Sequence, residues 1–176
     1  MSEPACNEVV LWIGDFHFGG GRTRIRTLLG SCISITLWHP RLKIGGMCHY
    51  LLPRRCTSEV TQAAAEGQYA AGAMQLFLRE LHQTGTRPED YVAKLFGGGC
   101  MFHDAFTEPA SPVALRNVAE QNIRAARELL SRYGFRIAAE EVGGFGSRQV
   151  IFEAWSGNVW LRRGSALCLP QLGAAA

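Results

Sequence analysis

The stretch LGSCISITLWHPRLKIGGMCHYLLP, from Leu29 to Pro53, largely decides the fold. Ile33 to Trp38 is rich in β-branched and apolar residues, so it favours a strand. His39-Pro40 interrupts this run, and the segment from Lys43 to Leu52 resumes it after a short gap. Two such runs with a short connection between them predict a β-hairpin.

Six similar β-rich runs before and after the hairpin join its two runs, which makes eight strand candidates. Glycine clusters mark the turns between them, and the triplet Gly19–Gly21 is predicted to be a flexible turn. The additional runs are Val9–Ile13, Ile25–Leu29, Tyr91–Phe96, Phe135–Val142, Arg148–Ala154 and Asn158–Arg163.

Two longer segments carry apolar residues at the spacing of an amphipathic helix. The first is predicted to be capped by Ser58, to run through Leu81 and to end at Gly85. The second spans Asn117 to Tyr133 and is stopped by Gly134, a usual residue after a helix C-terminus. Together these elements predict an α+β fold: a layered α/β/β sandwich of mostly antiparallel strands with both helices on one side.

The length and composition of the chain fit one globular domain. Its 176 residues, 47% hydrophobic and 19% charged, can bury a core without a disulfide or a metal. We expect a single domain over residues 1–176, with its core at about residues 9–163 and a frayed tail at about residues 169–176. A net charge of +3 with dispersed Lys and Arg argues against nucleic-acid binding.

The sequence contains no recognisable export or membrane signal. The first residues carry no Lys or Arg before an apolar run, and no segment approaches the roughly 18 apolar residues that span a bilayer. The six cysteines form no CxxC pair. We therefore expect a cytoplasmic protein with reduced thiols and no membrane insertion.

The turn Gly30-Ser31-Cys32 is the most informative segment for chemistry. Its glycine allows a tight bend, and its amide N–H groups can stabilise a tetrahedral oxyanion. A nucleophilic cysteine needs a base, and His49 lies at the far end of the hairpin that Cys32 begins. Cys48, beside that histidine, should point to the opposite face of its strand and belong to the core. From these residues alone, a Cys–His hydrolase and a purely structural role for both side chains are equally open.

A zinc site is a third alternative. It would use four soft ligands, but their spacing matches no standard zinc pattern, so we expect no metal. The ligands would be Cys32, His49, Cys56 and His103.

The Leu29–Pro53 stretch resembles the signature of the CheD family, the chemoreceptor glutamine deamidases of bacterial chemotaxis. The family pattern is LGSC, a β-run ending in Asp-Pro, and GGM-x-H-x-x-LP; here His39-Pro40 replaces the Asp-Pro. Asn117 and Arg148 fall in further blocks of the resemblance and are expected to make structural hydrogen bonds. These blocks follow in the family's order and extend the likeness over nearly the whole chain: Lys94–Phe102, Arg116-Asn117 and Glu141–Arg148.

The resemblance implies that Cys32 is the nucleophile and His49 the general base. The third catalytic residue of the family is a Thr six positions before the cysteine, where this chain has Arg26, with Thr27 next to it. One residue of shift turns a strand side chain to the opposite face, so Thr27, Ser31 or no hydroxyl are all open as the third group. The substrate and oxyanion pocket is expected to include Gly30, Ser31, Gly98 and Gly99.

The implied reaction converts a receptor glutamine into glutamate through a thioester on Cys32, with no metal or organic cofactor. The substrates would be methyl-accepting chemotaxis receptors, and a chemotaxis phosphatase of the CheC type would be a partner. Because such glutamines lie on helical bundles, the resemblance implies a shallow groove beside the cysteine. The alternative that Arg26 leaves open is a regulatory binding module for a receptor or phosphatase, with weak or absent catalysis.

Overall fold

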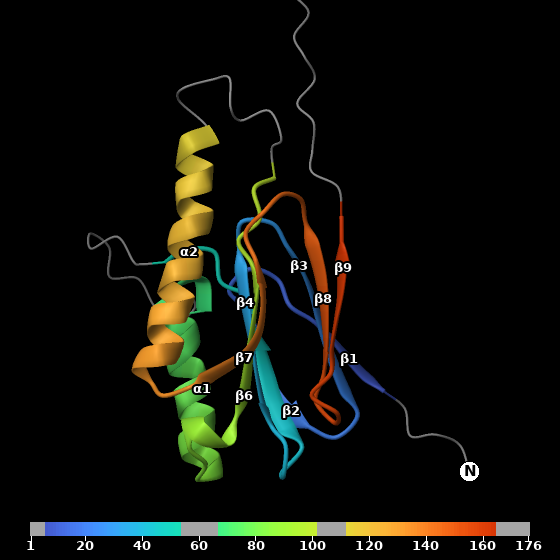
Figure 1. Cartoon of the computed structure of the whole chain (residues 1–176). Coiled ribbons are helices and arrows are strands. Elements are labelled where there is room, and N and C mark those ends of the chain that lie inside the picture. The colour runs from blue at the N-terminus through green and yellow to red at the C-terminus, as the bar shows by residue number, and fades with distance from the viewer. Residues whose placement is uncertain (1–5, 54–66, 102–111, 165–176) are drawn as a thin grey trace, which may run out of the picture.

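A computed structural model describes residues 6–53, 67–101 and 112–164. These residues form nine strands, two long helices and one short 3-10 helix (Figure 1). The elements are β1 (Asn7–Val10), β2 (Phe16–Gly20), β3 (Thr23–Leu29), β4 (Ile33–His39), β5 (Ile44–Cys48), α1 (Ala70–Thr84), η2 (Pro88–Asp90), β6 (Val92–Gly97), α2 (Pro112–Arg132), β7 (Arg136–Val142), β8 (Arg148–Glu153) and β9 (Val159–Arg163).

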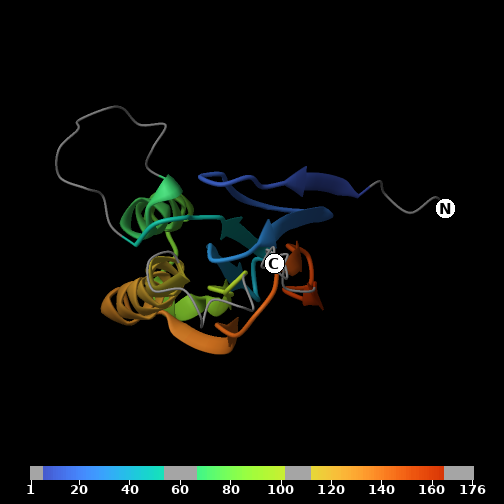
Figure 2. The ribbon, with the colours of Figure 1, turned by 90° about the horizontal axis from the view of Figure 1, so that it is seen from above.

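The strands form two sheets that pack face to face. The outer sheet has the order β1-β3-β8-β9, and the central sheet has the order β2-β5-β4-β6-β7. Both long helices cover the face of the central sheet that points away from the outer sheet (Figures 1 and 2). Only β1–β3 and β6–β7 pair in parallel; the other pairs of these sheets are antiparallel. The predicted α/β/β sandwich with both helices on one side is therefore confirmed.

The position of a strand in the layers explains its burial pattern. β4 lies in the middle of the central sheet with both faces covered, and six of its seven residues are buried. β3 lies in the outer sheet with one face toward solvent, so Thr23, Ile25, Thr27 and Leu29 are buried while alternate residues are more exposed. A strict alternation of this kind means that the inward side chains of β3 must face the central sheet.

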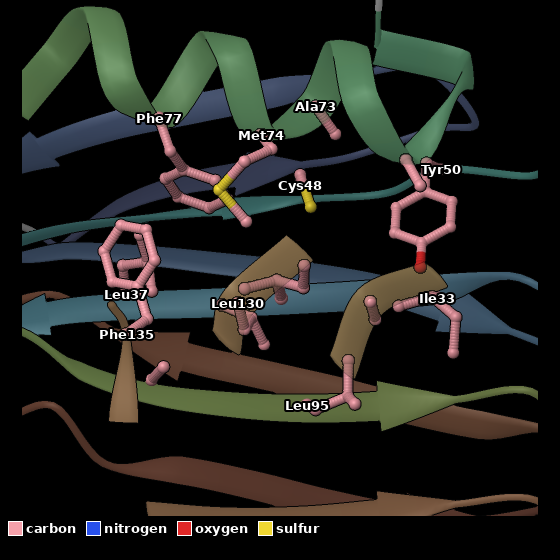
Figure 3. Packing of buried hydrophobic residues seen from close by; sticks show 14 of the residues in the cluster. Ile33, Leu37, Cys48, Tyr50, Ala73, Met74, Phe77, Leu95, Leu130 and Phe135 are labelled. Atoms are coloured by element: carbon pink, nitrogen blue, oxygen red, sulfur yellow. The ribbon is translucent and has the colours of Figure 1, made fainter. Parts of the chain in front are cut away.

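Two apolar clusters fill the spaces between the layers. The first joins the helices to the central sheet and includes Phe77 of α1, Leu130 of α2 and Leu95 of β6 (Figure 3). Cys48 belongs to this helix-side cluster, as its alternation with His49 predicts. The second cluster lies between the sheets and contains Leu11, Ile25, Leu29, Cys32, Met47, Phe96, Val150, Phe152 and Ala154.

The sequence prediction missed β2. Gly19 and Gly20 lie inside this strand rather than in a flexible turn, and Gly19 pairs with Gly45 of β5. A Cβ atom at Gly46 would lie 2.6 Å from the carbonyl oxygen of His17. The glycines of this pair therefore reflect close backbone approach between strands, a use of glycine that resembles a turn signal in sequence.

Several element boundaries also differ from the prediction. The first strand ends at Val10, and Trp12 beyond it is exposed. α1 begins at Ala70, and the expected cap Ser58 lies outside the described residues, as does the tail at 169–176. The helix stop at Gly85 is confirmed by its left-handed φ of 65°.

The second helix starts five residues earlier than predicted, at Pro112 instead of Asn117, and ends at Arg132. The predicted stop at Gly134 is confirmed by a φ of 82°. No helix in the described ranges combines the length and the apolar character needed to cross a membrane.

Candidate active site

Cys32 lies immediately before β4, in the turn that leads from the outer sheet to the central sheet. Its side chain is 7% exposed and belongs to the cluster between the sheets. The glycine segment after β6 packs directly against this turn: the Gly98 N–H donates to the Cys32 carbonyl oxygen at 2.8 Å, and the Gly99 N–H donates to that of Gly30 at 2.8 Å. Gly97 has a φ of 114°, and a Cβ there would collide with the Cys32 carbonyl oxygen, so this position requires glycine.

The strand register places Cys32 and His49 on the same face of the central sheet. Ile33 and Tyr50 exchange backbone hydrogen bonds of 3.0 Å, which extends the β4–β5 pairing beyond β5. In this register Ser34 lies directly opposite His49, and Cys32 is the diagonal neighbour of His49. Diagonal positions are typically about 7–8 Å apart at the backbone, within reach of long side chains. Both side chains therefore face the space between the sheets.

Thr27 approaches His49 from the opposite sheet. Its Oγ1 lies 2.8 Å from His49 Nδ1 and also 2.8 Å from the carbonyl oxygen of Leu11. A hydroxyl has one proton, and a carbonyl oxygen can only accept, so the Thr27 hydroxyl donates to Leu11. His49 Nδ1–H must then donate to Thr27 Oγ1. In the neutral ring this leaves Nε2 unprotonated, and Nε2 is buried without a hydrogen-bond partner among the described residues.

The register of β3 shows on which face of the outer sheet the Thr27 side chain lies. The pairing of β3 with β8 runs from Arg24 to Leu29 without a shift, so no bulge is needed to turn Thr27 inward. Arg26 points outward and lies within 4.0 Å of Glu8. Ser31, the other hydroxyl considered from the sequence, makes no side-chain hydrogen bond to a described residue.

The backbone of His49 is held by the loop before β2. The His49 N–H donates to the Asp15 carbonyl oxygen at 3.0 Å, and the Gly14 N–H donates to the His49 carbonyl oxygen at 2.7 Å. The Asp15 carboxylate accepts the Trp12 backbone N–H at 2.8 Å, which fixes the loop. Neither Asp15 nor the carbonyl of Leu11 stands out in the sequence, since each reaches the site through contacts that form only in the folded chain.

Burial keeps both members of the candidate dyad neutral. Burial raises the pKa of the Cys32 thiol to about 11, and the N–H of the same residue offsets a smaller part of this shift. Burial lowers the pKa of His49, opposed by the Leu11 carbonyl and the charge of Asp15. No hydrogen bond joins the Cys32 thiol to the imidazole within the described part of the chain. The resting state is thus a neutral thiol and a neutral imidazole on the same face of the central sheet.

The predicted pocket residues differ in whether their backbone N–H groups already make hydrogen bonds. Gly98 and Gly99 already donate to the backbone oxygens of Cys32 and Gly30, so their N–H groups are not available to a reacting oxygen. Ser31 and Cys32 donate their N–H groups to no other described residue. The amides available to a reacting oxygen therefore lie in the turn of the cysteine itself.

Two polar residues of the later blocks have distinct positions. Asn117 is exposed on α2. Arg148 is 3% exposed, donates to the Gly143 carbonyl oxygen and lies 3.4 Å from the Glu141 carboxylate. It thereby holds the β7–β8 turn, and Gly144 of that turn accepts the Cys100 N–H at 2.8 Å. Arg148 is a structural hydrogen-bonding group, as predicted.

Asn122 has a structural role that was not predicted from the sequence. Its side chain is fully buried and donates to the carbonyl oxygens of Ser31 and Leu51. The sequence signal for this role is the position of Asn122 next to Ile123, on the helix face where Ala119 and Ala126 are also buried. A polar side chain on a buried face needs hydrogen-bond partners.

The zinc alternative has no support in the described residues. They contain no group of three or more His, Cys, Asp or Glu side chains arranged to hold a metal ion. Cys56 and His103, two of the four ligands considered, lie outside the described ranges.

The matching family model and close relatives indicate one family. The model of the CheD family, described as chemotactic sensory transduction, matches residues 51–163. The probable chemoreceptor glutamine deamidase CheD 3 of Dechloromonas aromatica is 46% identical over 155 residues, 88% of this chain and 86% of that protein. The probable chemoreceptor glutamine deamidase CheD of Pseudomonas fluorescens is 44% identical over 163 residues, 92% of this chain and 88% of that protein.

A third relative extends the match to almost the full chain. The probable chemoreceptor glutamine deamidase CheD 1 of Chromobacterium violaceum is 42% identical over 170 residues, 97% of this chain and 84% of that protein. This match includes the region of Cys32 and His49, which the family-model match does not reach. Among solved structures, the Bacillus licheniformis hypothetical protein YfiH covers 72% of this chain and 49% of that chain, with a TM-score of 0.43 and 13% identity. That likeness is too remote to indicate a function.

The raised pKa of Cys32 predicts an unusual pH dependence of its alkylation. Because only the thiolate reacts, the iodoacetamide rate at Cys32 should still rise about tenfold per pH unit at pH 9.5, whereas free cysteine levels off above its pKa of about 8.5. Peptide mapping by mass spectrometry separates Cys32 from the other cysteines, and circular dichroism checks that the fold persists. A rate that is already constant below pH 8 would show a preformed thiolate and contradict the neutral pair.

Proposed function

The chain belongs to the CheD family of chemotactic sensory transduction proteins, and we propose that it is a protein-glutamine deamidase that acts on chemoreceptors. The observation that carries the chemistry is the hydrogen bond between Thr27 and His49 Nδ1. It leaves Nε2 as an acceptor on the sheet face that also carries Cys32. A thiol and an adjacent unprotonated imidazole nitrogen are the two groups that a cysteine hydrolase requires.

The first half of the reaction forms a thioester. His49 Nε2 takes the proton of the Cys32 thiol as the sulfur attacks the carboxamide carbon of a glutamine side chain. The carboxamide oxygen becomes an oxyanion, which N–H groups of the Gly30–Cys32 turn stabilise. The imidazolium then gives its proton to the leaving nitrogen, the C–N bond breaks, and ammonia departs.

The second half restores the enzyme. His49 Nε2 takes a proton from water as the water oxygen attacks the thioester carbon. The C–S bond breaks, the sulfur regains a proton from His49, and a glutamate side chain is released. Thr27 keeps Nδ1 as the protonated nitrogen throughout, so Nε2 can shuttle the proton. The receptor gains one negative charge in each event.

The substrate class follows from the names of the relatives, which are chemoreceptor glutamine deamidases. We include methyl-accepting chemotaxis receptors as substrates, a cytoplasmic location and a phosphatase of the CheC type as partner in the proposal; these finer points rest on the family resemblance. Gly98 and Gly99 would line the pocket on one side of Cys32, and Gly30 and Ser31 on the other.

Replacement of the nucleophile should abolish the reaction. Cys32→Ala removes the only atom that can form the thioester, so ammonia release from a receptor cytoplasmic fragment should fall to background, with the Gln-to-Glu change absent by mass spectrometry. Cys48→Ala is the matched control, since this second buried cysteine faces the helices, and it should retain activity. Full activity of folded Cys32→Ala would show that the nucleophile is assigned wrongly.

Loss of the Thr27 hydroxyl should impair His49 as the base, while valine keeps nearly the same shape as threonine. Thr27→Val should lower kcat by about 10²-fold or more, because His49 loses the acceptor that fixes its tautomer, and Thr27→Ser should recover most of the activity. Thr23→Val is the matched control: Thr23 is buried on the same face of β3 but donates to Gly20 instead. Equal losses in Thr27→Val and Thr27→Ser would rule out a role for the hydroxyl.

A further inference from the structure

Asn122 of α2 links the two strands that carry the proposed dyad. Its Nδ2 donates to the carbonyl oxygen of Ser31 at 3.1 Å and to that of Leu51 at 2.7 Å. One carboxamide thus holds the residue just before Cys32 and the residue two positions after His49. The side chain has no exposed surface, so these two hydrogen bonds form away from water.

The same turn of α2 is fixed by a third hydrogen bond to the central sheet. The hydroxyl of Tyr50, the residue after His49, donates to the backbone oxygen of Asn122 at 2.7 Å. Figure 3 shows the Tyr50 ring in the helix-side cluster with its hydroxyl pointing away from α1 and toward the brown ribbon of α2. Asn122 is therefore held through both its backbone and its side chain, and its position relative to the cysteine turn is well defined.

This contact sets the direction of the Ser31–Cys32 peptide. The described chain contains no cis peptide bonds, and in a trans peptide the C=O and the following N–H point in opposite directions. Asn122 donates to the Ser31 carbonyl oxygen from the helix side of the central sheet. The Cys32 N–H consequently points away from Asn122, and it interacts with its own thiol.

The hydrogen bonding of the Cys32 N–H within the described residues is consistent with this direction. The Cys32 N–H donates to no other described residue, and it lies close enough to its own sulfur to favour the thiolate. An amide that lies beside the attacking atom and makes no hydrogen bond to another described residue has the properties of an oxyanion donor.

We propose that Asn122 is a positioning residue that aims the Cys32 N–H at the oxyanion formed during glutamine attack. The inference rests on the proposed deamidase function. Asn122 does not touch the substrate; it acts by holding the Ser31 carbonyl oxygen, and the Cys32 amide makes the contact. The bonds that form and break are those of the thioester mechanism, with no additional reactant.

The first test is the kinetic effect of Asn122→Asp. Aspartate has nearly the same shape but no N–H to donate, so the Ser31 and Leu51 carbonyls lose their donor and the peptide is released. We expect kcat for ammonia release from a receptor cytoplasmic fragment to fall by about 10²–10³-fold, with KM changed much less. Asn117→Asp makes the same chemical change at an exposed position of the same helix, and it should keep wild-type kcat.

The second test does not depend on deamidation. In Asn122→Asp the Cys32 amide is no longer held toward its sulfur, so the alkylation profile of Cys32 with iodoacetamide should move to higher pH, while Asn117→Asp should keep the wild-type profile. If the wild-type protein releases no ammonia, the deamidase proposal fails, and this profile still tests whether Asn122 orients the amide.

Unchanged kcat in folded Asn122→Asp, or a kcat loss with an unchanged alkylation profile, would overturn the inference. If Asn122→Asp does not fold, Tyr50→Phe provides the test, because it removes only the hydroxyl that holds the Asn122 backbone. It should lower kcat several-fold at constant KM and move the alkylation profile in the same direction. No change in either quantity would overturn the inference.

Discussion

The hydroxyl of Thr27 joins the two sheets at the point where the chemistry is proposed. It donates to the Leu11 carbonyl oxygen and accepts from His49 Nδ1, both at 2.8 Å. Since the hydroxyl has only one proton, this arrangement determines which imidazole nitrogen is protonated. The sandwich is needed for the arrangement, because β3 supplies the hydroxyl from the outer sheet while the central sheet supplies His49 and Cys32.

The same layering gives the dyad its resting state. Packing between two sheets disfavours charge, so burial raises the pKa of Cys32 to about 11 and lowers that of His49. A neutral thiol reacts slowly with oxidants and other electrophiles, and it becomes a nucleophile when the imidazole takes its proton. A buried amide-hydrolysing cysteine of this kind relies on its base and its oxyanion donors rather than on a preformed thiolate.

The sequence predicted the layers and the proposed dyad because their signals are local. Alternating apolar runs, helical periodicity and the Gly-Ser-Cys turn gave the sandwich and drew attention to Cys32 and His49. The missed features depend on tertiary contact: β2 carries glycines because two backbones approach closely, and Asn122 matters only because α2 places it over the Ser31 carbonyl. The face of Thr27 was open for the same reason, since it depends on the β3–β8 register.

The protonation of His49 in the resting protein is the most direct measurement. Nitrogen-15 NMR of the labelled imidazoles at neutral pH distinguishes Nδ1–H from Nε2–H, and a His49→Asn variant assigns the signals among the five histidines. The hydrogen-bond chain from His49 through Thr27 to Leu11 predicts a neutral ring protonated at Nδ1, with this preference lost in Thr27→Val. A ring protonated at Nε2, or an imidazolium at neutral pH, would contradict it.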